Sequence, residues 1–406
     1  MTSQLRVVVL GGGECGARVA HDLATSDLDA RVVLVGREAR PPYERPPLSK
    51  SVLVDDDPRP VEPYRDGRLD VGGLEVLQGR TATSLDLDGR AVVLDDGTRL
   101  AYDRLVLATG AQPRRLPDLP PEALTLRTFE DALVLRAALR PGAHLLVVGA
   151  GLVGLEVAAS ARTRGTRVTV VEAEERALGR AVPGPVAQVL VARHEAEGVD
   201  LRLGTTVTSA TVTSGGWQVE LSDGSVVSPD VVLQAVGSVP ETGLARAAGL
   251  EVDDGVVVDA RMRTSAPDVW AAGDCCAGPV AALGRRQRLE SWRMAHDQAA
   301  VVAASVRGED ASITAVPWFW SDQYDLSLQV SGMAAAATRW VERPRPDGTV
   351  VHLGLDDGGA LVCAAGAGRA AVAKDVRMAE RLVAAGARPD PDQLVDPAVP
   401  LRSLIG

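Results

Sequence analysis

Two glycine-rich turns contain the residues whose types and spacing most directly suggest a chemical function. The first has the form G-x-G-x-x-G, is made by Gly11, Gly13 and Gly16, and follows an apolar run. In such a turn the first glycine allows a tight bend, the second lets backbone approach a pyrophosphate, and the third lets a helix pack close to the strand. The helix expected over 17–23 offers its N-terminal N–H groups to phosphate, with the amide of Cys15 well placed to donate. A glycine turn without a ligand has the same sequence, so this motif alone leaves both interpretations open.

A second copy of the motif favours the binding interpretation. It also follows an apolar run, and a helix and a strand are expected after it. The strand ends on Glu172, about 20 residues beyond the glycines, where the fingerprint places an acid that binds ribose hydroxyls. Two such folds indicate two bound dinucleotides. We assign to the second site Gly149, Gly151, Leu152, Val153 and Gly154.

The ribose-binding acid of the first fold is less well defined. A strand is expected over 31–35, and Gly36, Arg37 and Glu38 follow it. Arg37 stands where the acid is expected, and Glu38 is the next candidate. The sequence leaves both residues as candidates for contact with the ribose or the adenine.

The order of these elements predicts an α/β fold with two Rossmann-like dinucleotide-binding domains and a C-terminal α+β domain. A length of 406 residues suits two or three domains. After the second nucleotide fold the chain is expected to return to the first, so the second domain is an insertion. The predicted boundaries are 1–112 with 240–311 for the first domain, 113–239 for the inserted domain and 312–406 for the C-terminal domain.

Composition excludes several classes of function. The chain has 46% hydrophobic and 24% charged residues, which is typical of a globular protein. Its net charge of -11 argues against nucleic acid as a general partner. The apolar segment 145–161 contains Glu156 and is too short to span a membrane. The short apolar run at the N-terminus does not resemble a signal peptide, so we expect a cytoplasmic protein without a membrane partner.

The cysteines give no sign of redox or metal chemistry. Cys15, Cys275, Cys276 and Cys363 form no C-x-x-C pair and no metal-ligand spacing. A flavin enzyme that reduces disulfides needs a redox-active cysteine pair, and the sequence shows none. We therefore predict no metal site, and we interpret the adjacent Cys275 and Cys276 as small buried residues.

Aromatic residues make up only 3% of the chain, yet several crowd into one region. They are Trp292, Trp318, Phe319, Trp320 and Tyr324. A large planar ligand would explain this cluster, because aromatic faces stack well on planar rings. Core packing of the C-terminal domain is the alternative.

Taken in order, the motifs resemble one family along nearly the whole chain. Besides the two glycine motifs they are YERPPLSK at 43–50, LATG at 107–110, AGDC at 272–275, LESW at 289–292 and PWFWSDQYDL at 317–326. The chain resembles the flavin-dependent ferredoxin reductases of bacterial oxygenase systems, of the putidaredoxin reductase and biphenyl-dioxygenase reductase type. YERPPLSK and PWFWSDQYDL are specific to this type, whereas the glycine motifs are shared by all glutathione-reductase-like flavoproteins.

This resemblance implies that FAD lies on the first fold. Asp274 would bond the ribityl and phosphate region, the backbone near Ala82 would hold the adenosine end, and Trp292 and Trp320 would cover the flavin. The implied FAD contacts are Gly11, Gly13, Cys15, Gly16, Arg37, Glu38, Arg45, Lys50, Ala82, Ala108, Thr109, Gly110, Arg127, Asp274, Ser291, Trp292 and Trp320.

The resemblance also implies that NAD(H) occupies the second fold. Lys50 would lie near the flavin ring, with Glu156 as its ion-pair partner beside the nicotinamide. Gly237 and Glu290 would border the nicotinamide. Glu172 would accept both ribose hydroxyls and repel a 2′-phosphate, which favours NADH over NADPH. The main catalytic contribution would be to position the nicotinamide over the flavin, without an acid or base from the protein.

The electron acceptor implied by the resemblance is a small iron–sulfur ferredoxin, such as a [2Fe-2S] protein. Two proteins of like net charge need a local basic patch to meet productively. Four arginines that flank LESW are candidates for such a patch, and a solvated charge run is the alternative. They are Arg285, Arg286, Arg288 and Arg293.

Other functions remain open at this stage. An NADH oxidase or peroxidase of this superfamily usually carries a cysteine near the flavin, in the region where this chain has 46–50 and no cysteine. A rubredoxin reductase or a monodehydroascorbate reductase shares the cysteine-free flavin site. A flavin-bound NADH-sensing interaction protein, like apoptosis-inducing factor, belongs to a different class, and turnover with a ferredoxin would separate it from a reductase.

Overall fold

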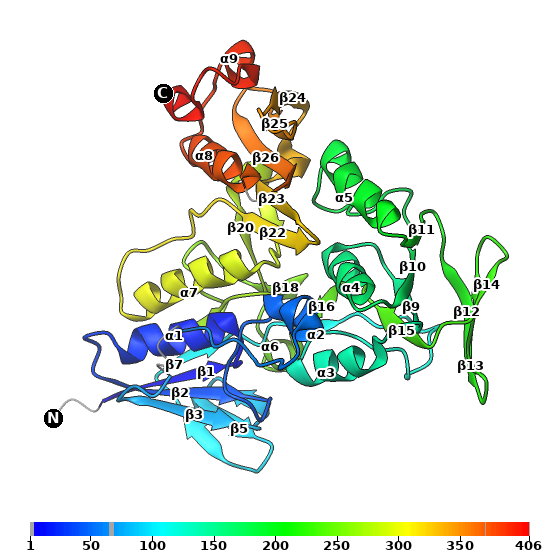
Figure 1. Cartoon of the computed structure of the whole chain (residues 1–406). Coiled ribbons are helices and arrows are strands. Elements are labelled where there is room, and N and C mark those ends of the chain that lie inside the picture. Colours follow the sequence, from blue (N-terminus) through cyan, green and yellow to red (C-terminus); the bar gives the residue numbers. More distant parts are fainter. Residues whose placement is uncertain (1–3, 65–68, 370, 406) are drawn as a thin grey trace. The chain divides into compact units, whose positions relative to one another are not determined.

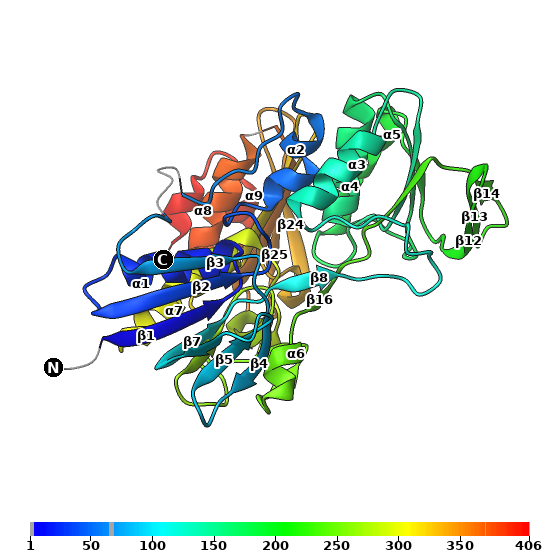
Figure 2. The ribbon, with the colours of Figure 1, turned by 90° about the horizontal axis from the view of Figure 1, so that it is seen from below.

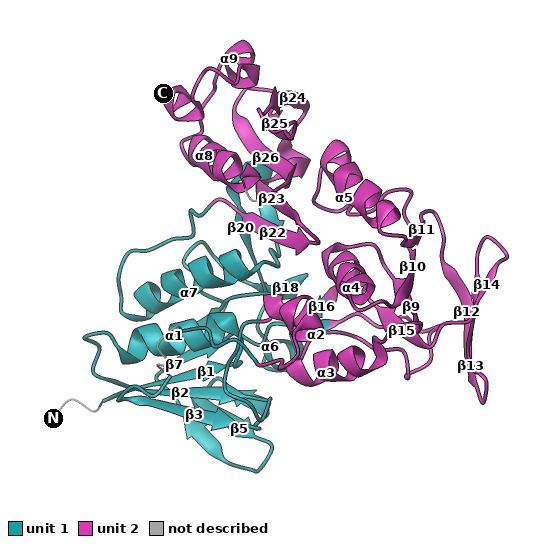
Figure 3. Ribbon diagram, in the orientation of Figure 1, with its two compact units in different colours: residues 1–44, 60–112, 239–315 teal, residues 45–59, 113–238, 316–406 magenta. Residues whose placement is uncertain are grey.

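The computed structural model describes residues 4–64, 69–369 and 371–405, and its contacts divide the chain into two compact units (Figure 1, Figure 3). Unit 1 comprises residues 1–44, 60–112 and 239–315, and unit 2 comprises residues 45–59, 113–238 and 316–406. Residues 45–59, expected in the first domain, thus pack in unit 2. The inserted nucleotide fold and the C-terminal region also share unit 2.

Unit 1 is built around the strand that precedes the first glycine turn. Its elements are β1 (Leu5–Leu10), α1 (Glu14–Ala24), β2 (Ala30–Gly36), β3 (Leu74–Gln78), β4 (Ala82–Asp86), β5 (Ala91–Leu94), β6 (Arg99–Ala101), β7 (Arg104–Leu107), α6 (Gly243–Ala247), β17 (Val252–Asp253), β18 (Gly255–Val257), β19 (Val269–Ala271), β20 (Cys276–Val280), η2 (Ala281–Leu283), β21 (Arg285–Gln287) and α7 (Trp292–Val306). A parallel sheet has the order β19-β7-β1-β2-β3, and Figure 2 shows β3, β2, β1 and β7 side by side.

The central strand β1 is an apolar run because both faces of a parallel sheet are covered. Val7, Val8, Val9 and Leu10 are at most 2% exposed. Helix α1 packs beside α7 in the same unit (Figure 1). Burial of β1 between the mostly buried strands β2 and β7 holds the end of β1, and therefore the first glycine turn, in a fixed place.

Two further sheets complete unit 1. The antiparallel strands β4, β5 and β6 form one, and the order β17-β18-β20-β21 forms the other. The chain passes between the units in β8 (Ala111–Pro113) and β16 (Ser238–Pro240), which pair with each other.

Unit 2 repeats the nucleotide-binding arrangement and adds an antiparallel sheet. Its elements are η1 (Pro46–Ser49), α2 (Ser51–Val54), α3 (Phe129–Ala138), β9 (His144–Val148), α4 (Leu152–Thr163), β10 (Arg167–Val171), α5 (Gly184–Ala196), β11 (Asp200–Arg202), β12 (Val207–Thr213), β13 (Gly216–Leu221), β14 (Val226–Val227), β15 (Val231–Gln234), β22 (Trp318–Gln323), β23 (Leu326–Gly332), η3 (Ala334–Ala336), β24 (Arg339–Pro344), β25 (Val350–Leu355), β26 (Leu361–Gly368), α8 (Val372–Ala384), α9 (Pro391–Val395) and η4 (Leu401–Leu404).

The parallel sheet of unit 2 has the order β11-β10-β9-β15. Strand β9 pairs with β10 on one side and β15 on the other, as β1 pairs with β2 and β7. The predicted α/β fold with two nucleotide-binding folds is therefore confirmed. The helices α5 and α7 were not predicted from the sequence.

The C-terminal sheet has the order β22-β23-β26-β25-β24, and α8 packs against it. Apolar residues of α8 recur at helical spacing, and its buried side chains are Val372, Val376, Ala379 and Leu382. Among the described residues, no helix combines the length and the apolar character that crossing a bilayer requires.

A buried arginine ties the chain's last segment to this sheet. Arg343 of β24 is 6% exposed, and its guanidinium donates to the carbonyls of Leu394, Asp396 and Val399 at 2.7–2.8 Å. The carbonyl of Leu394 lies in the last turn of α9 and the other two follow this helix, where the backbone belongs to no strand. One side chain thus satisfies several backbone acceptors at once.

We expect Arg343→Met to lower the free energy of unfolding by about 3 kcal/mol, because several carbonyls lose a charged donor. Urea denaturation measures this change. The matched control is Arg339→Met, which removes an exposed arginine from the same strand and should change stability by less than about 0.5 kcal/mol. Equal stability of the two variants would contradict the structural role of Arg343.

Candidate nucleotide-binding sites

The first glycine turn lies between the end of β1 and the start of α1. Gly11 has φ +121°, and a Cβ added there would lie 2.0 Å from the carbonyl oxygen of Ala108. A Cβ on Gly16 would lie 2.0 Å from the oxygen of Gly11. Side chains are therefore excluded at both positions, as the motif predicts.

The second glycine turn has the same construction in unit 2. A Cβ on Gly149 would lie 2.5 Å from the oxygen of Ala235, and one on Gly154 would lie 2.1 Å from the oxygen of Gly149. The amide of Gly11 donates at 2.8 Å to the carbonyl of Val35 in β2, and the amide of Gly149 donates at 2.8 Å to the carbonyl of Val171 in β10. The two turns thus repeat the same backbone contacts.

The middle glycines are the residues that leave room for a ligand. Among the residues that the structure describes, no heavy atom lies within 4 Å of a Cβ built on Gly13 or on Gly151. These two residues are the N-caps of α1 and α4, and neither supplies a side-chain cap, so the first backbone N–H groups face this open side. Both turns therefore fit the pyrophosphate of a dinucleotide.

The acid of the second fold contacts the turn itself. Glu172 follows β10, and its carboxylate accepts from the amides of Ala150 at 2.8 Å and Glu174 at 3.0 Å. The backbone of Glu172 is also bonded on both sides, to Arg202 and to Thr205. The carboxylate is therefore held beside the glycine turn, with its outer side half-exposed.

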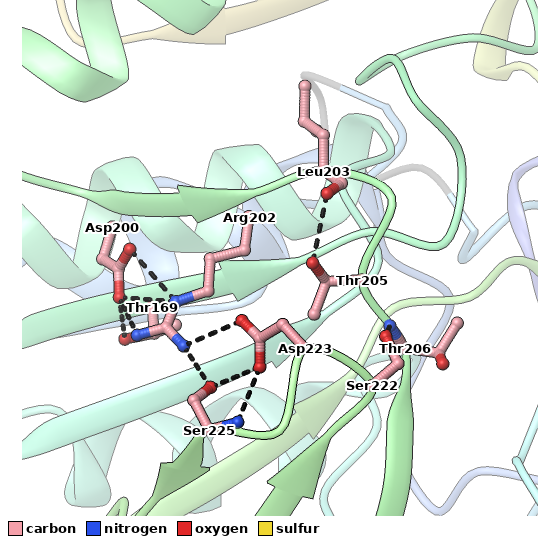
Figure 4. Close-up of polar contacts among 9 residues, drawn as sticks. All are labelled: Thr169, Asp200, Arg202, Leu203, Thr205, Thr206, Ser222, Asp223 and Ser225. Atoms are coloured by element: carbon pink, nitrogen blue, oxygen red, sulfur yellow. Dashed lines mark hydrogen bonds and ion pairs between the residues drawn. The ribbon is translucent and has the colours of Figure 1, made fainter.

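A polar cluster holds the chain that supports Glu172 (Figure 4). The guanidinium of Arg202 donates to Asp200 at 2.8 Å and to Ser225 at 2.7 Å. Ser225 donates in turn to Asp223, and this hydrogen bond lowers the pKa of Asp223 below its usual value. The cluster joins β11 to the β13–β14 turn and so fixes the loop that braces Glu172.

The first fold has no acid at the position that corresponds to Glu172. By the shared backbone contacts that position is Gly36. Arg37 is exposed, whereas Glu38 is half-buried and accepts a hydrogen bond from the hydroxyl of Tyr43. The contact of Arg37 or Glu38 with FAD stays a prediction.

Several predicted FAD contacts gather around the first turn in unit 1. A Cβ on Gly273 would lie 3.2 Å from the Cβ of Cys15, which places the neighbouring Asp274 beside the turn. Ser291 caps α7 by accepting from the amide of Met294. Trp292 is the first residue of α7, and the guanidinium of Arg18 lies 5.7 Å from the centroid of the Trp292 ring.

Other predicted contacts of this group have local backbone roles. Ala108 is buried, and the hydroxyl of Thr109 donates to the carbonyl of Glu241 at 2.7 Å. Gly110 has φ +71° and its carbonyl accepts from the amide of Glu241. Ala82 begins β4 and is half-buried.

Further predicted FAD contacts lie in unit 2. Arg45 donates to the backbone carbonyl of Arg127, just before the capped start of α3. Trp320 stacks on Trp318 with centroids 5.0 Å apart, and the guanidinium of Arg377 lies 4.4 Å from the Trp318 ring. Trp292 of the aromatic cluster belongs to unit 1 instead.

The expected ion pair is present in unit 2. The Nζ atom of Lys50 lies 2.7 Å from a carboxylate oxygen of Glu156, whose side chain is only 7% exposed. Lys50 also donates to the carbonyl of Pro46 at 3.0 Å. A buried carboxylate needs such a partner, because desolvation without compensation would favour its neutral form.

The carboxylate of Glu156 has two further partners that the sequence analysis missed. The hydroxyls of Ser49 and Ser321 both donate to it, the latter at 2.6 Å. Their place in the sequence marked both serines as candidates, because Ser49 lies in YERPPLSK and Ser321 in PWFWSDQYDL, the two motifs that are specific to this type of reductase. Their spacing in sequence, however, gives no indication that they meet at one carboxylate.

Gly237, expected to border the nicotinamide, lies between β15 and β16. Gly237 has φ +91°, and a Cβ there would meet no heavy atom within 4 Å. Glu290, expected to border the nicotinamide, lies in unit 1 and is paired with Arg288.

The prediction of an exposed basic patch is wrong for one of its four arginines, Arg288. Arg288 is 5% exposed, and its guanidinium is bonded to Glu290 and lies 3.4 Å from Asp254, so it cannot form part of an exposed patch. Arg293 is half-buried and paired with Asp297 at 2.8 Å. The exposed members are Arg285 and Arg286, which lie in β21.

All four cysteines are free and buried. Burial raises the pKa of each thiol, for Cys363 to about 12. They are therefore protonated at neutral pH, whereas disulfide exchange requires a thiolate. The interpretation of Cys275 and Cys276 as small buried residues is confirmed.

Comparison with known proteins agrees with this geometry. Residues 5–299 match the pyridine nucleotide-disulphide oxidoreductase family, and residues 318–405 match the reductase C-terminal family. The chain therefore belongs to the pyridine nucleotide-disulphide oxidoreductases and carries a reductase C-terminal domain. It is an oxidoreductase, and its cofactors are FAD and NAD(H).

Particular relatives resemble the chain along most of its length. It is 39% identical over 403 residues to the ferredoxin–NAD(+) reductase component of the anthranilate 1,2-dioxygenase system of Burkholderia cepacia, covering 98% of each chain. It is 36% identical over 333 residues to a rubredoxin–NAD(+) reductase of Pseudomonas putida, covering 81% of this chain and 86% of the relative. Among solved structures, the covalent putidaredoxin reductase–putidaredoxin complex matches with a TM-score of 0.92, 32% identity and coverage of 100% and 99%. The family expected from the sequence is confirmed.

The two glycine turns give a direct test of the nucleotide site. We expect Gly151→Ala to fold normally, because its Cβ meets no atom within 4 Å, yet to weaken NAD⁺ binding about tenfold or more, because the methyl group occupies the pyrophosphate's approach. Gly154→Ala should lower thermal stability as well, since its Cβ would lie 2.1 Å from the oxygen of Gly149. Calorimetric titration and thermal melts measure both effects. Unchanged NAD⁺ affinity in Gly151→Ala would show that the pyrophosphate binds elsewhere.

Proposed function

We propose that this protein is an FAD-dependent NADH:ferredoxin oxidoreductase that supplies electrons to an oxygenase or a cytochrome P450 through a small iron–sulfur ferredoxin. The observation that carries the proposal is the pair of nucleotide folds in a chain whose four cysteines are all buried and free. Electrons that enter from NADH have no disulfide to reduce, so an external acceptor must take them. The relatives named as ferredoxin reductases and the solved complex with putidaredoxin support a ferredoxin as that acceptor.

The protein's contribution is to bind and orient the two cofactors. The chemistry that bound FAD would supply is the conversion of two-electron hydride donation into single-electron transfer. Gly13 and Gly151 allow the two pyrophosphates to approach the backbone, and Asp274 lies beside the first turn. The Lys50 ammonium and the Glu156 carboxylate are held together as a neutral pair. These fixed groups orient the reactants, which accounts for catalysis without an acid or base.

The remaining predicted contacts belong to the same proposal. Of the predicted flavin contacts, Arg45, Arg127 and Trp320 belong to unit 2, and Ser291 and Trp292 belong to unit 1. A cytoplasmic location is consistent with four unpaired cysteines, because oxidising compartments favour disulfides.

The first experiment is anaerobic addition of NADH or NADPH to the purified protein, followed in the visible flavin spectrum. We expect NADH to bleach the flavin faster, because the carboxylate of Glu172 accepts ribose hydroxyls and repels a 2′-phosphate. Glu172→Gln should reduce the preference for NADH about tenfold, while Glu220→Gln, an exposed carboxylate on β13, should leave it unchanged. A flavin that NADH cannot bleach would overturn the proposal.

The acceptor surface is tested by charge reversal at the exposed arginines of β21. We expect Arg285→Glu/Arg286→Glu to slow reduction of an acidic ferredoxin about tenfold at low salt and to spare NADH-dependent ferricyanide reduction, because only the protein acceptor depends on electrostatic steering. The control is Arg31→Glu/Arg99→Glu, which reverses two exposed, ion-paired arginines elsewhere in unit 1. Equal losses with ferredoxin and ferricyanide would exclude β21 as the docking surface.

A rubredoxin reductase is the second candidate, and the 36% identity to such an enzyme supports it. Parallel assays with a [2Fe-2S] ferredoxin and a rubredoxin separate the two functions. A higher kcat/KM with rubredoxin would replace the ferredoxin assignment.

A further inference from the structure

The buried carboxylate of Glu156 receives donors from three separate parts of unit 2. Lys50 and Ser49 bond to one oxygen, and Ser321 donates to the other. Glu156 comes from α4, the two residues 49 and 50 from the segment around η1, and Ser321 from β22. The carboxylate is thus fixed in orientation as well as in charge.

The bond from Ser321 is the last link of a longer chain of hydrogen bonds. The side-chain amide of Gln323 donates to the hydroxyl of Ser321 at 3.0 Å. The Nε2 atom of His194 lies 2.8 Å from the amide oxygen of Gln323. The hydroxyl of Tyr324 lies 3.2 Å from Nδ1 of His194. Ser321, Gln323 and His194 are at most 1% exposed, so water cannot replace these links.

The chemistry of the groups gives every link the same direction. The oxygen of Gln323 can only accept, so His194 must donate from Nε2. Burial lowers the pKa of His194, which leaves its ring neutral with a single N–H. Its Nδ1 atom therefore accepts from Tyr324. All four donors point toward Glu156, and such an aligned chain strengthens each bond along it.

The same helix also holds the segment that carries Lys50. The hydroxyl of Ser160, one turn after Glu156 on α4, donates to the backbone carbonyl of Ser49 at 2.7 Å. The backbone of the η1 segment and the charge of Glu156 are therefore fixed by neighbouring residues of one helix. Strand β22 packs against α4 from the C-terminal sheet and completes this support.

We infer that Ser321, Gln323 and His194 are positioning residues, which hold the Glu156–Lys50 pair in the orientation that hydride transfer requires. The inference rests on the proposed function, because it takes the pair to lie at the nicotinamide and the flavin. By this arrangement the C-terminal sheet contributes to catalysis through Ser321, in addition to any role in partner binding. This series of hydrogen bonds does not conduct protons. The side-chain amide of Gln323 accepts with its oxygen and donates with its nitrogen, and it cannot pass a proton from one atom to the other.

The test compares Ser321→Ala with Ser321→Thr in the FAD-loaded protein. We expect Ser321→Ala to lower the maximal rate of flavin reduction by NADH about tenfold, with the half-saturating NADH concentration unchanged within about a factor of two, because orientation is lost and binding is not. Ser321→Thr keeps the hydroxyl and should restore the rate. His194→Phe breaks the chain farther from Glu156 and should lower the rate by about threefold.

A second measurement does not depend on turnover. In Ser321→Ala without added NADH, amide hydrogen exchange over residues 46–54 should become faster, because the carboxylate that binds Ser49 and Lys50 is less restrained. The matched control is Ser331→Ala, which removes a hydroxyl of the same sheet that is fully buried and has no hydrogen-bond partner among the described residues. This control should match the original protein in both measurements.

The outcomes separate this inference from the proposed function. If NADH does not bleach the original protein, the proposed function fails, whatever the exchange data show. If it does, and Ser321→Ala behaves like Ser331→Ala in either measurement, the positioning role is overturned. A slower rate that Ser321→Thr does not restore would also overturn it, since the loss would then not come from the hydroxyl.

Discussion

The packing of several segments of unit 2 depends on the buried carboxylate of Glu156. Glu156 lies one turn into the helix after the second glycine motif, where its carboxylate is removed from water. Desolvation of an unpaired carboxylate is too costly for a marginally stable fold, so the surrounding segments must supply donors. Lys50 supplies the opposite charge, and two serines supply the remaining hydrogen bonds. The η1 segment, α4 and the C-terminal sheet are tied together by this single requirement.

A steric constraint plays the corresponding role at both nucleotide folds. Gly11 and Gly149 approach a neighbouring carbonyl so closely that a Cβ would overlap with it. Gly13 and Gly151, the middle glycines of the two motifs, are open instead, because the ligand and not the protein needs that space. One motif thus needs glycine for two reasons, a close approach of the backbone to a carbonyl and space for a ligand. Both reasons apply in each unit, so the motif occurs in both.

The sequence predicted these turns well because their geometry is local. Gly11 to Gly16 form one strand-to-helix connection, and the same holds for the second copy. The pairing of Lys50 with Glu156 followed from a family resemblance and not from spacing, because more than a hundred positions separate them. The burial of Arg288 could not be predicted, since its acidic partner Asp254 comes from a loop that only folding brings near.

The sequence by itself determined the α/β class, the two glycine turns, the acid Glu172 and the lack of a redox cysteine pair, because each is set by residue type over a short stretch. Only the tertiary structure showed that Ser49 and Ser321 also donate to Glu156 and that β22 reaches α4. It also decided which arginines remain in solvent. Long-range packing sets both burial and partners, and short-range patterns carry little information about contacts between distant segments.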